Sequence, residues 1–128
     1  KLILIKTKAF HLDTVFTTIL DRHGELCAVI VCKDLISKDS FDLLNQFTIS
    51  NNIEIINIPP NDSIGIDNNI GSLAVNNFSA PGLLISSSSF SEPSVAKYLN
   101  SKNIKMETTP VSQFQLSGGS IHCLTNEL

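Results

Sequence analysis

Two short segments near opposite ends of the sequence carry residue types that could perform covalent chemistry. The first, His11–Thr17, places an imidazole and a carboxylate two positions apart, at His11 and Asp13. The second, Gly118–Cys123, begins with two glycines and ends in a thiol. A thiol, a base and a fixed anion are the groups that nucleophilic catalysis on a cationic carbon centre requires.

Cys123 has two interpretations that its residue type alone does not separate. Most free cysteines are small buried hydrophobes. Against this, the Gly118-Gly119 pair lets backbone approach a ligand closely, and Ser120 and His122 disfavour a fully apolar environment. Cys123 is therefore a candidate nucleophile. If the segment is a strand, His122 faces away from Cys123, because adjacent strand residues point to opposite faces.

The other two cysteines lie in an apolar run, Leu26–Cys32, which predicts a strand buried on both faces. We interpret Cys27 and Cys32 as structural. An odd number of cysteines at irregular spacing favours free thiols in a reducing compartment over a disulfide framework, so we expect a cytoplasmic protein.

His11 and Asp13 fall on one face of a strand predicted within Ala9–Leu20, together with Val15 and Thr17. Two interpretations remain open for them. They lie either on an exposed strand edge or in a polar pocket, as a base and an anion directed at one ligand.

The sequence pattern predicts the elements that position these residues. The first half is predicted to contain strands over Lys1–Lys6, Ala9–Leu20, Leu26–Cys32 and Ile53–Ile58, and a helix over Asp39–Ser50 capped by Asp39 or Ser40. The second half is predicted to contain strands over Gly71–Asn76 and Leu83–Ser86, and a last strand from Asn103 that ends before Pro110. Between them a helix is predicted, with Ser91 as its cap and Pro93 in its first turn. The apolar face of this helix is formed by Val95, Tyr98 and Leu99. The polar stretch between Pro60 and Ile70 is predicted to be a loop.

The two halves align as a weak internal repeat. Ile53 aligns with Ile104 and Pro59 with Pro110, each pair 51 positions apart. The sequence therefore predicts an α/β (α+β) fold of two ββαβ modules, over about 1–60 and 71–110, followed by a cysteine-bearing segment over 113–128. Two modules would leave sheet edges open, which favours further modules of the same protein or a homo-oligomer as their cover.

The composition excludes two classes of partner. The net charge is −3 and no Lys/Arg cluster occurs, so a nucleic-acid surface is not expected. No apolar run reaches the about 18 to 20 residues that span a bilayer, so a membrane partner is not expected either. No CxxC or CxxH pair points to zinc.

The two opening segments resemble the histidine and cysteine motifs of one known group. The run His11-Leu12-Asp13-Thr14-Val15-Phe16-Thr17 resembles the histidine motif of arginine deiminases and amidinotransferases, and the run Gly118-Gly119-Ser120-Ile121-His122-Cys123 is similar to their cysteine motif, especially that of agmatine deiminases. This is the pentein, or guanidine-modifying, superfamily, which also includes dimethylarginine dimethylaminohydrolases. The resemblance implies a propeller of five ββαβ modules, of which this chain would be the C-terminal portion.

The resemblance also implies roles for individual residues. Cys123 would attack the guanidinium carbon, His11 would shuttle protons, and Asp13 would bind the guanidinium nitrogens. Gly118 and Gly119 would let backbone approach the substrate. A bound cation would also stabilise the thiolate. The implied activity is a hydrolase acting on a small guanidino compound such as arginine, through a covalent thiouronium and without a cofactor.

Three alternatives remain beside this prediction. An amidinotransferase would use the same residues with an amine in place of water. A non-catalytic binding module could keep the fold without activity. A metal site could use His11, Asp13 and Cys123, although their spacing does not favour one. Related enzymes carry further guanidinium-binding carboxylates upstream of the histidine motif, so we expect the missing N-terminal part to supply them and the 128 residues alone to be inactive or impaired.

Overall fold

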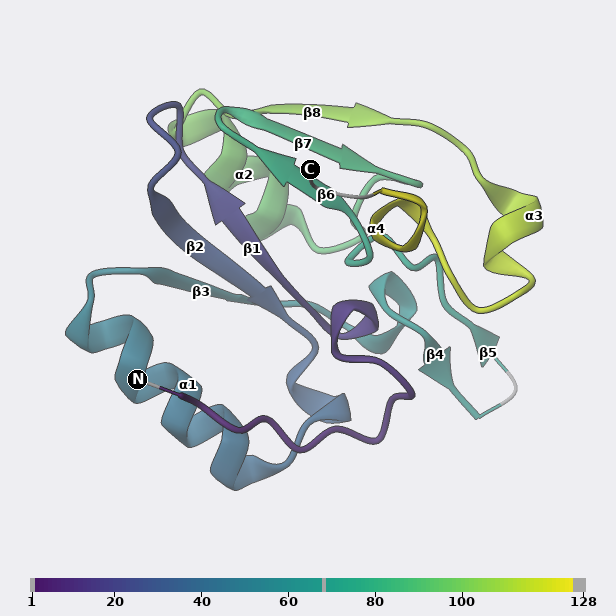
Figure 1. The fold of residues 1–128 in the computed structure, drawn as a ribbon, viewed down its shortest axis with the longest axis horizontal. Coiled ribbons are helices and arrows are strands. Elements are labelled where there is room, and N and C mark those ends of the chain that lie inside the picture. The colour runs from purple at the N-terminus through teal and green to yellow at the C-terminus, as the bar shows by residue number, and fades with distance from the viewer. Residues whose placement is uncertain (1, 68, 126–128) are drawn as a thin grey trace.

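Two three-stranded sheets form the framework of the fold in the computed structural model, which describes residues 2–67 and 69–125 (Figure 1). In the first sheet, β1 (Phe16–Leu20) pairs antiparallel with β2 (Leu26–Val31), and β2 pairs parallel with β3 (Glu54–Asn57). Helix α1 (Lys38–Ser50) connects β2 to β3. Strand β2 lies at the centre of the sheet and is buried from Ala28 to Val31, which explains its continuous apolar sequence.

The second sheet has the same strand order and the same orientations. Strand β6 (Phe78–Ala80) pairs antiparallel with β7 (Leu83–Ser86), and β7 pairs parallel with β8 (Lys105–Thr108). Helix α2 (Pro93–Ser101) connects β7 to β8 and buries Val95 and Leu99, as its predicted apolar face requires. Its N-terminal cap is Glu92 rather than the predicted Ser91, because the Glu92 carboxylate accepts the N–H of Ser94.

Short elements precede, connect and follow the sheets. They are the 3₁₀ turns η1 (Leu12–Thr14), η2 (Lys33–Leu35) and η3 (Pro60–Asp62), a hairpin of β4 (Gly65–Ile66) and β5 (Asn69–Ile70), and the one-turn helices α3 (Ser112–Gln115) and α4 (Ile121–Leu124). The hairpin corrects the prediction of a loop over this stretch. Its strands are two residues long, too short to produce a recognisable alternation of apolar and polar residues.

Two of the predicted strands are absent. Residues 2–6 form no strand, and Thr7 pairs with Ile36 only as an isolated bridge; Lys1 lies outside the described residues. The stretch Gly71–Asn76 is irregular, and the strand begins at Phe78 instead. Apolar residues in this stretch are buried as part of a turn, so burial rather than strand pairing accounts for their character.

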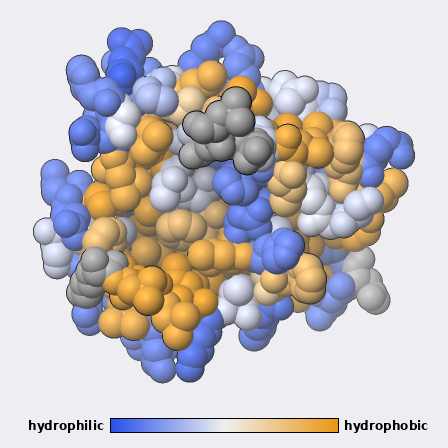
Figure 2. Space-filling model, in the orientation of Figure 1, coloured by the Kyte–Doolittle hydropathy of each residue, from blue (hydrophilic) through white to orange (hydrophobic). Residues whose placement is uncertain are grey.

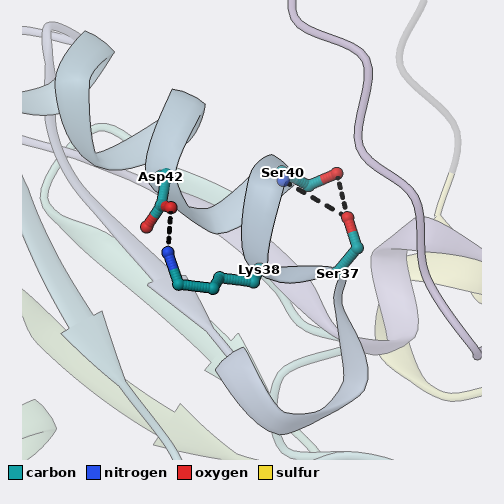
Figure 3. Close-up of polar contacts among 4 residues, drawn as sticks. All are labelled: Ser37, Lys38, Ser40 and Asp42. Atoms are coloured by element: carbon teal, nitrogen blue, oxygen red, sulfur yellow. Dashed lines mark hydrogen bonds and ion pairs between the residues drawn. The ribbon is translucent and has the colours of Figure 1, made fainter.

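Helix α1 begins one residue earlier than predicted, because its cap is Ser37 rather than Asp39 or Ser40. The Ser37 hydroxyl accepts the backbone N–H of Ser40 and donates to the Ser40 hydroxyl at 2.9 Å. Figure 3 shows this cap beside an exposed ion pair between Lys38 and Asp42, one turn apart. This cap determines that α1 begins at Lys38.

The two sheets meet where β1 lies beside β6 (Figure 1). The N–H of Leu20 donates to the Ser79 hydroxyl at 3.1 Å, and the Tyr98 hydroxyl on α2 donates to the Cys27 carbonyl on β2 at 2.9 Å. One hydrophobic core, including Val15, Ile30, Leu84 and Leu99, runs through both sheets. The segments that precede β1 and β6 are therefore held at fixed positions relative to each other.

Part of the molecular surface is apolar. On the face drawn in Figure 2, hydrophobic side chains gather at the lower left, over the N-terminal segment and α1. Leu2 and Leu4 belong to this segment and are exposed. Among the described residues, none of the helices is both long enough and apolar enough to cross a lipid bilayer.

Candidate active site

Asp13 and Cys123 meet although 110 positions separate them in sequence. The Cys123 Sγ lies 3.4 Å from Asp13 Oδ2, within the range of a thiol donating to a carboxylate. Asp13 belongs to η1, immediately before β1, and Cys123 belongs to α4. The other carboxylate oxygen, Oδ1, is buried and has no hydrogen-bond partner among the described residues.

His11 and Asp13 do not share a strand face, which corrects the sequence prediction. His11 is the residue that precedes η1, with extended backbone, and Asp13 lies inside the turn. The N–H and the hydroxyl of Thr14 both donate to the His11 carbonyl, the hydroxyl at 2.6 Å. Such local hydrogen bonds from threonine compete with strand pairing and close the turn here.

His11 lies on the wall of the same hollow as Cys123. This hollow has a volume of about 490 Å³, and Gly118 and Gly119 also line it. The imidazole is exposed and packs against Phe10, with ring centroids 4.5 Å apart. The imidazole makes no hydrogen bond in the part of the chain that the structure describes. His11 and Cys123 therefore line the same hollow, but no hydrogen bond joins their side chains.

The two glycines shape the approach to the thiol in different ways. Gly118 has a φ of +84°, a conformation that L side chains rarely adopt, but a Cβ there would meet no atom within 4 Å. At Gly119 a Cβ would lie 3.2 Å from the Cys123 Cβ and 3.4 Å from its Sγ. Gly119 therefore leaves free space beside the Cys123 thiol, whereas Gly118 allows the positive φ of the turn.

The segment around Cys123 is a helical turn rather than a strand, so the argument that His122 must face away from Cys123 does not apply. The His122 backbone N–H donates to the Asn76 carbonyl at 3.2 Å. Its side chain and Asp13 line a second hollow of about 280 Å³. Asp13 thus lines the second hollow, whereas His11 and Cys123 line the first.

Asn76 is a site residue that sequence reasoning missed. It is fully buried, and its side chain bonds both the Asp13 segment and the Cys123 segment. The available signal was a polar pair, Asn76-Asn77, directly after the apolar run Leu73–Val75. That signal is weak, because paired asparagines are also common in exposed turns.

The other two cysteines have environments unlike that of Cys123. Cys32 is buried, and burial raises the pKa of its thiol above the ordinary value. The Cys27 thiol is partly buried and donates to the Ile19 carbonyl at 3.4 Å. Cys123 is exposed. Cys27 on β2 and Cys32 directly after it thus both have the environment expected of structural cysteines.

The described ranges 2–67 and 69–125 contain no set of side chains that could form a metal centre. No group of three or more His, Cys, Asp or Glu side chains there is arranged to hold a metal ion. His11, Asp13 and Cys123, the residues of the alternative metal site, do not form such a group.

No protein-family model matches the sequence, and no curated protein is significantly similar to it. Solved structures, in contrast, give clear matches. The apo structure of ArgZ, an arginine dihydrolase from the ornithine-ammonia cycle in cyanobacteria, matches with a TM-score of 0.73 at 17% identity, over 95% of this chain and 17% of ArgZ. The N-terminal domain of ArgZ bound to product gives the same TM-score and identity, with 40% of that domain covered.

A complex of an AgrE cysteine-to-alanine mutant with L-arginine matches with a TM-score of 0.72 at 16% identity, over 94% of this chain and 16% of AgrE. At this identity the likeness establishes fold and not activity. The chain spans well under half the length of each of these neighbours. Its mixed α/β fold is that of part of AgrE and of part of ArgZ.

Proposed function

We propose that this chain carries the nucleophile and part of the substrate site of a guanidino-group hydrolase. The observation that supports this most directly is the 3.4 Å contact between the Cys123 thiol, which lines one hollow, and the Asp13 carboxylate, which lines the other. A thiol beside a carboxylate suits a substrate that is both cationic and electrophilic. A guanidinium group has both properties.

Asp13 would bind the guanidinium group. Its Oδ1 is buried without a hydrogen-bond partner among the described residues, and its Oδ2 accepts the Cys123 thiol. A guanidinium N–H group could donate to Oδ2 in place of the thiol, as a charge-assisted hydrogen bond. The displaced thiol would then lie beside the carbon, and the bound positive charge would stabilise its thiolate.

The reaction would proceed through a covalent intermediate. The Cys123 sulfur forms a bond to the guanidinium carbon, and the C–N bond to the leaving amine breaks as that amine takes a proton. Water then adds to the carbon and loses one proton to the base, and its second proton goes to solvent as the C–S bond breaks and the ureide and the thiolate are released. His11 lines the same hollow and is the base there that could carry both protons.

The fold neighbours support this chemistry by analogy. ArgZ is described as an arginine dihydrolase, and structures of its N-terminal domain hold substrate, product or a covalently bound reaction intermediate. By the same analogy, we propose that the two sheets are two ββαβ modules of a pentein propeller. Further modules would complete the substrate site, so the 128 residues alone would turn over poorly.

Activity of the intact protein on a panel of guanidino compounds tests this function. Arginine, agmatine and methylated arginines are assayed for release of ammonia, alkylamine and urea. Cys123→Ser should lower kcat by roughly 10³-fold or more, because it removes the nucleophile. Asp13→Asn should raise KM roughly 10- to 100-fold, because charge-assisted hydrogen bonds are lost. Cys27→Ser serves as the control, since Cys27 lies on β2 away from both hollows.

Full activity of Cys123→Ser on a substrate of the unmodified protein would contradict the proposal. Product analysis also separates hydrolysis from group transfer. A hydrolase releases a ureide in water alone, whereas an amidinotransferase needs an added amine to turn over.

A further inference from the structure

Asn76 occupies the point where the two chemistry-bearing segments of the chain meet. It lies immediately before β6, and its side chain is fully buried. Buried asparagines are costly unless each polar atom has a partner. Asn76 meets this requirement through bonds to two segments that are far apart in the sequence, around Asp13 and around Cys123.

The first set of bonds holds the turn that carries the thiol. Asn76 Oδ1 accepts the N–H of Ser120 at 2.9 Å and the N–H of Cys123 at 3.5 Å. The Asn76 carbonyl accepts the N–H of His122 at 3.2 Å. Helix α4 receives no cap from its own Ser120, whose hydroxyl is buried without a partner among the described residues. Asn76 therefore supplies the acceptors that the first turn of α4 lacks.

The second bond holds the turn that carries the carboxylate. Asn76 Nδ2 donates to the Asp13 carbonyl at 3.2 Å. One rigid amide thus bonds both segments, with its acceptor toward Cys123 and its donor toward Asp13. An asparagine side chain combines a donor and an acceptor on one planar group of this size.

We propose that Asn76 is a positioning residue that sets the Cys123 thiol against the Asp13 carboxylate for reaction with a guanidinium group. This inference rests on the proposed function. Without the side-chain amide, the N–H groups of Ser120 and Cys123 and the Asp13 carbonyl lose their shared partner, and the two segments are free to move apart. A displacement of about 1 Å between reacting groups can cost about 100-fold in rate.

The test compares two alkylating probes of similar size on the intact protein. Chloroacetamidine is cationic and mimics a guanidinium head, whereas chloroacetamide is neutral. In both reactions the Cys123 sulfur forms a bond to the CH₂ carbon and displaces chloride. The ratio of the two rate constants at Cys123 reports how well Asp13 directs a cation to the thiol. A general loss of thiol exposure alters both rates and leaves the ratio unchanged.

Three variants give the comparison. Asn76→Ala should lower the cation preference at least about tenfold, as should Asp13→Asn. Asn77→Ala is the matched control, because Asn77 is equally buried but bonds Thr17 and Ala74. It should keep the preference. Equal preference in Asn76→Ala and Asn77→Ala would overturn the inference while the proposed function stands, whereas absence of any preference in the unmodified protein would overturn both.

Hydrogen exchange provides a second measurement if Asn76→Ala fails to fold. Asn76→Asp has nearly the same shape and keeps an acceptor for Ser120 and Cys123, but it has no donor for the Asp13 carbonyl. The amides of α4 should stay protected in this variant, while those of Leu12–Thr14 should exchange faster. Unchanged exchange in both segments would overturn the inference.

Discussion

At the scale of single residues, the neighbouring groups determine how accessible the Cys123 thiol and the Asp13 carboxylate are. Asp13 keeps one oxygen buried without a partner among the described residues, and Cys123 is exposed on a one-turn helix. Gly119 leaves space directly against the thiol. Each of these features can be altered separately.

Gly119→Ala should impair the thiol more than Gly118→Ala. The new methyl group would lie 3.2 Å from the Cys123 Cβ and 3.4 Å from Sγ, so the cysteine side chain must move. Gly118→Ala meets no neighbouring atom, and its cost is backbone strain of about 1 kcal/mol at positive φ. Alkylation rates at Cys123 measure the first effect, and denaturant unfolding measures the second. Equal alkylation in both variants would contradict this account.

Cys123 should be alkylated long before Cys32 at neutral pH. Burial raises the pKa of the Cys32 thiol, so its reactive thiolate forms only at higher pH, and the buried sulfur is also inaccessible to the reagent. Peptide mass spectrometry after labelling at increasing pH follows the two cysteines separately. Labelling of Cys32 as fast as Cys123 in the folded protein would show that the first sheet is not packed as described.

At the scale of secondary-structure elements, hydrogen bonds at helix ends decide where each element begins. Ser37 caps α1, and Asn76 supplies acceptors to α4 from outside that helix. Sequence rules locate the first kind of end, since a serine stands beside the helix it caps. The second kind depends on a residue 44 positions away from Ser120.

Ser37→Ala should lower the free energy of unfolding by about 1 kcal/mol, because Ser40 loses the acceptor for its N–H. Lys38→Ala is the matched control on the same turn. Its ion pair with Asp42 is exposed (Figure 3), so we expect no measurable change in the denaturation midpoint. Chemical denaturation followed by circular dichroism measures both. A larger loss in Lys38→Ala than in Ser37→Ala would reverse this ranking.

At the scale of the whole molecule, the meeting of the two sheets decides the site. The turn before β1 carries Asp13 and the turn before β6 carries Asn76, so the packing of β1 against β6 places both at one end of the sheets. Tyr98 strengthens the same junction, because its hydroxyl on α2 donates to the Cys27 carbonyl on β2.

Tyr98 should make the fold lose stability at alkaline pH. Burial and the hydrogen bond to Cys27 raise the phenol pKa well above its ordinary value, so the folded chain holds this proton more tightly than the unfolded chain. Stability is therefore full below about pH 10, where the unfolded phenol titrates, and falls as the pH rises above it. Tyr98→Phe should weaken this dependence of stability on pH. Urea unfolding midpoints measured below and above about pH 10 test it.

Tyr98 is the single tyrosine in the sequence, and no tryptophan is present, so phenolate absorbance follows this group alone. Titration of the folded protein with the pKa of free tyrosine would contradict the expected proton retention.

Local pattern was sufficient for much of the fold. The sequence predicted the bounds of four elements within one or two residues: β2, β7, α1 and α2. Burial gives each of these segments a pattern of apolar residues that can be recognised from that segment alone. The irregular stretch before β6 and the turn η1 were not, since their backbones follow side-chain hydrogen bonds to distant or competing partners.

The sequence by itself determined which groups could act: a thiol at Cys123, an imidazole at His11 and a carboxylate at Asp13. Only the tertiary structure decided that Cys123 and Asp13 touch, that His11 shares a hollow without bonding the thiol, and that Asn76 joins the two segments. The reason is physical. Residue chemistry is a local property, whereas a contact across 110 positions exists only after two sheets have packed.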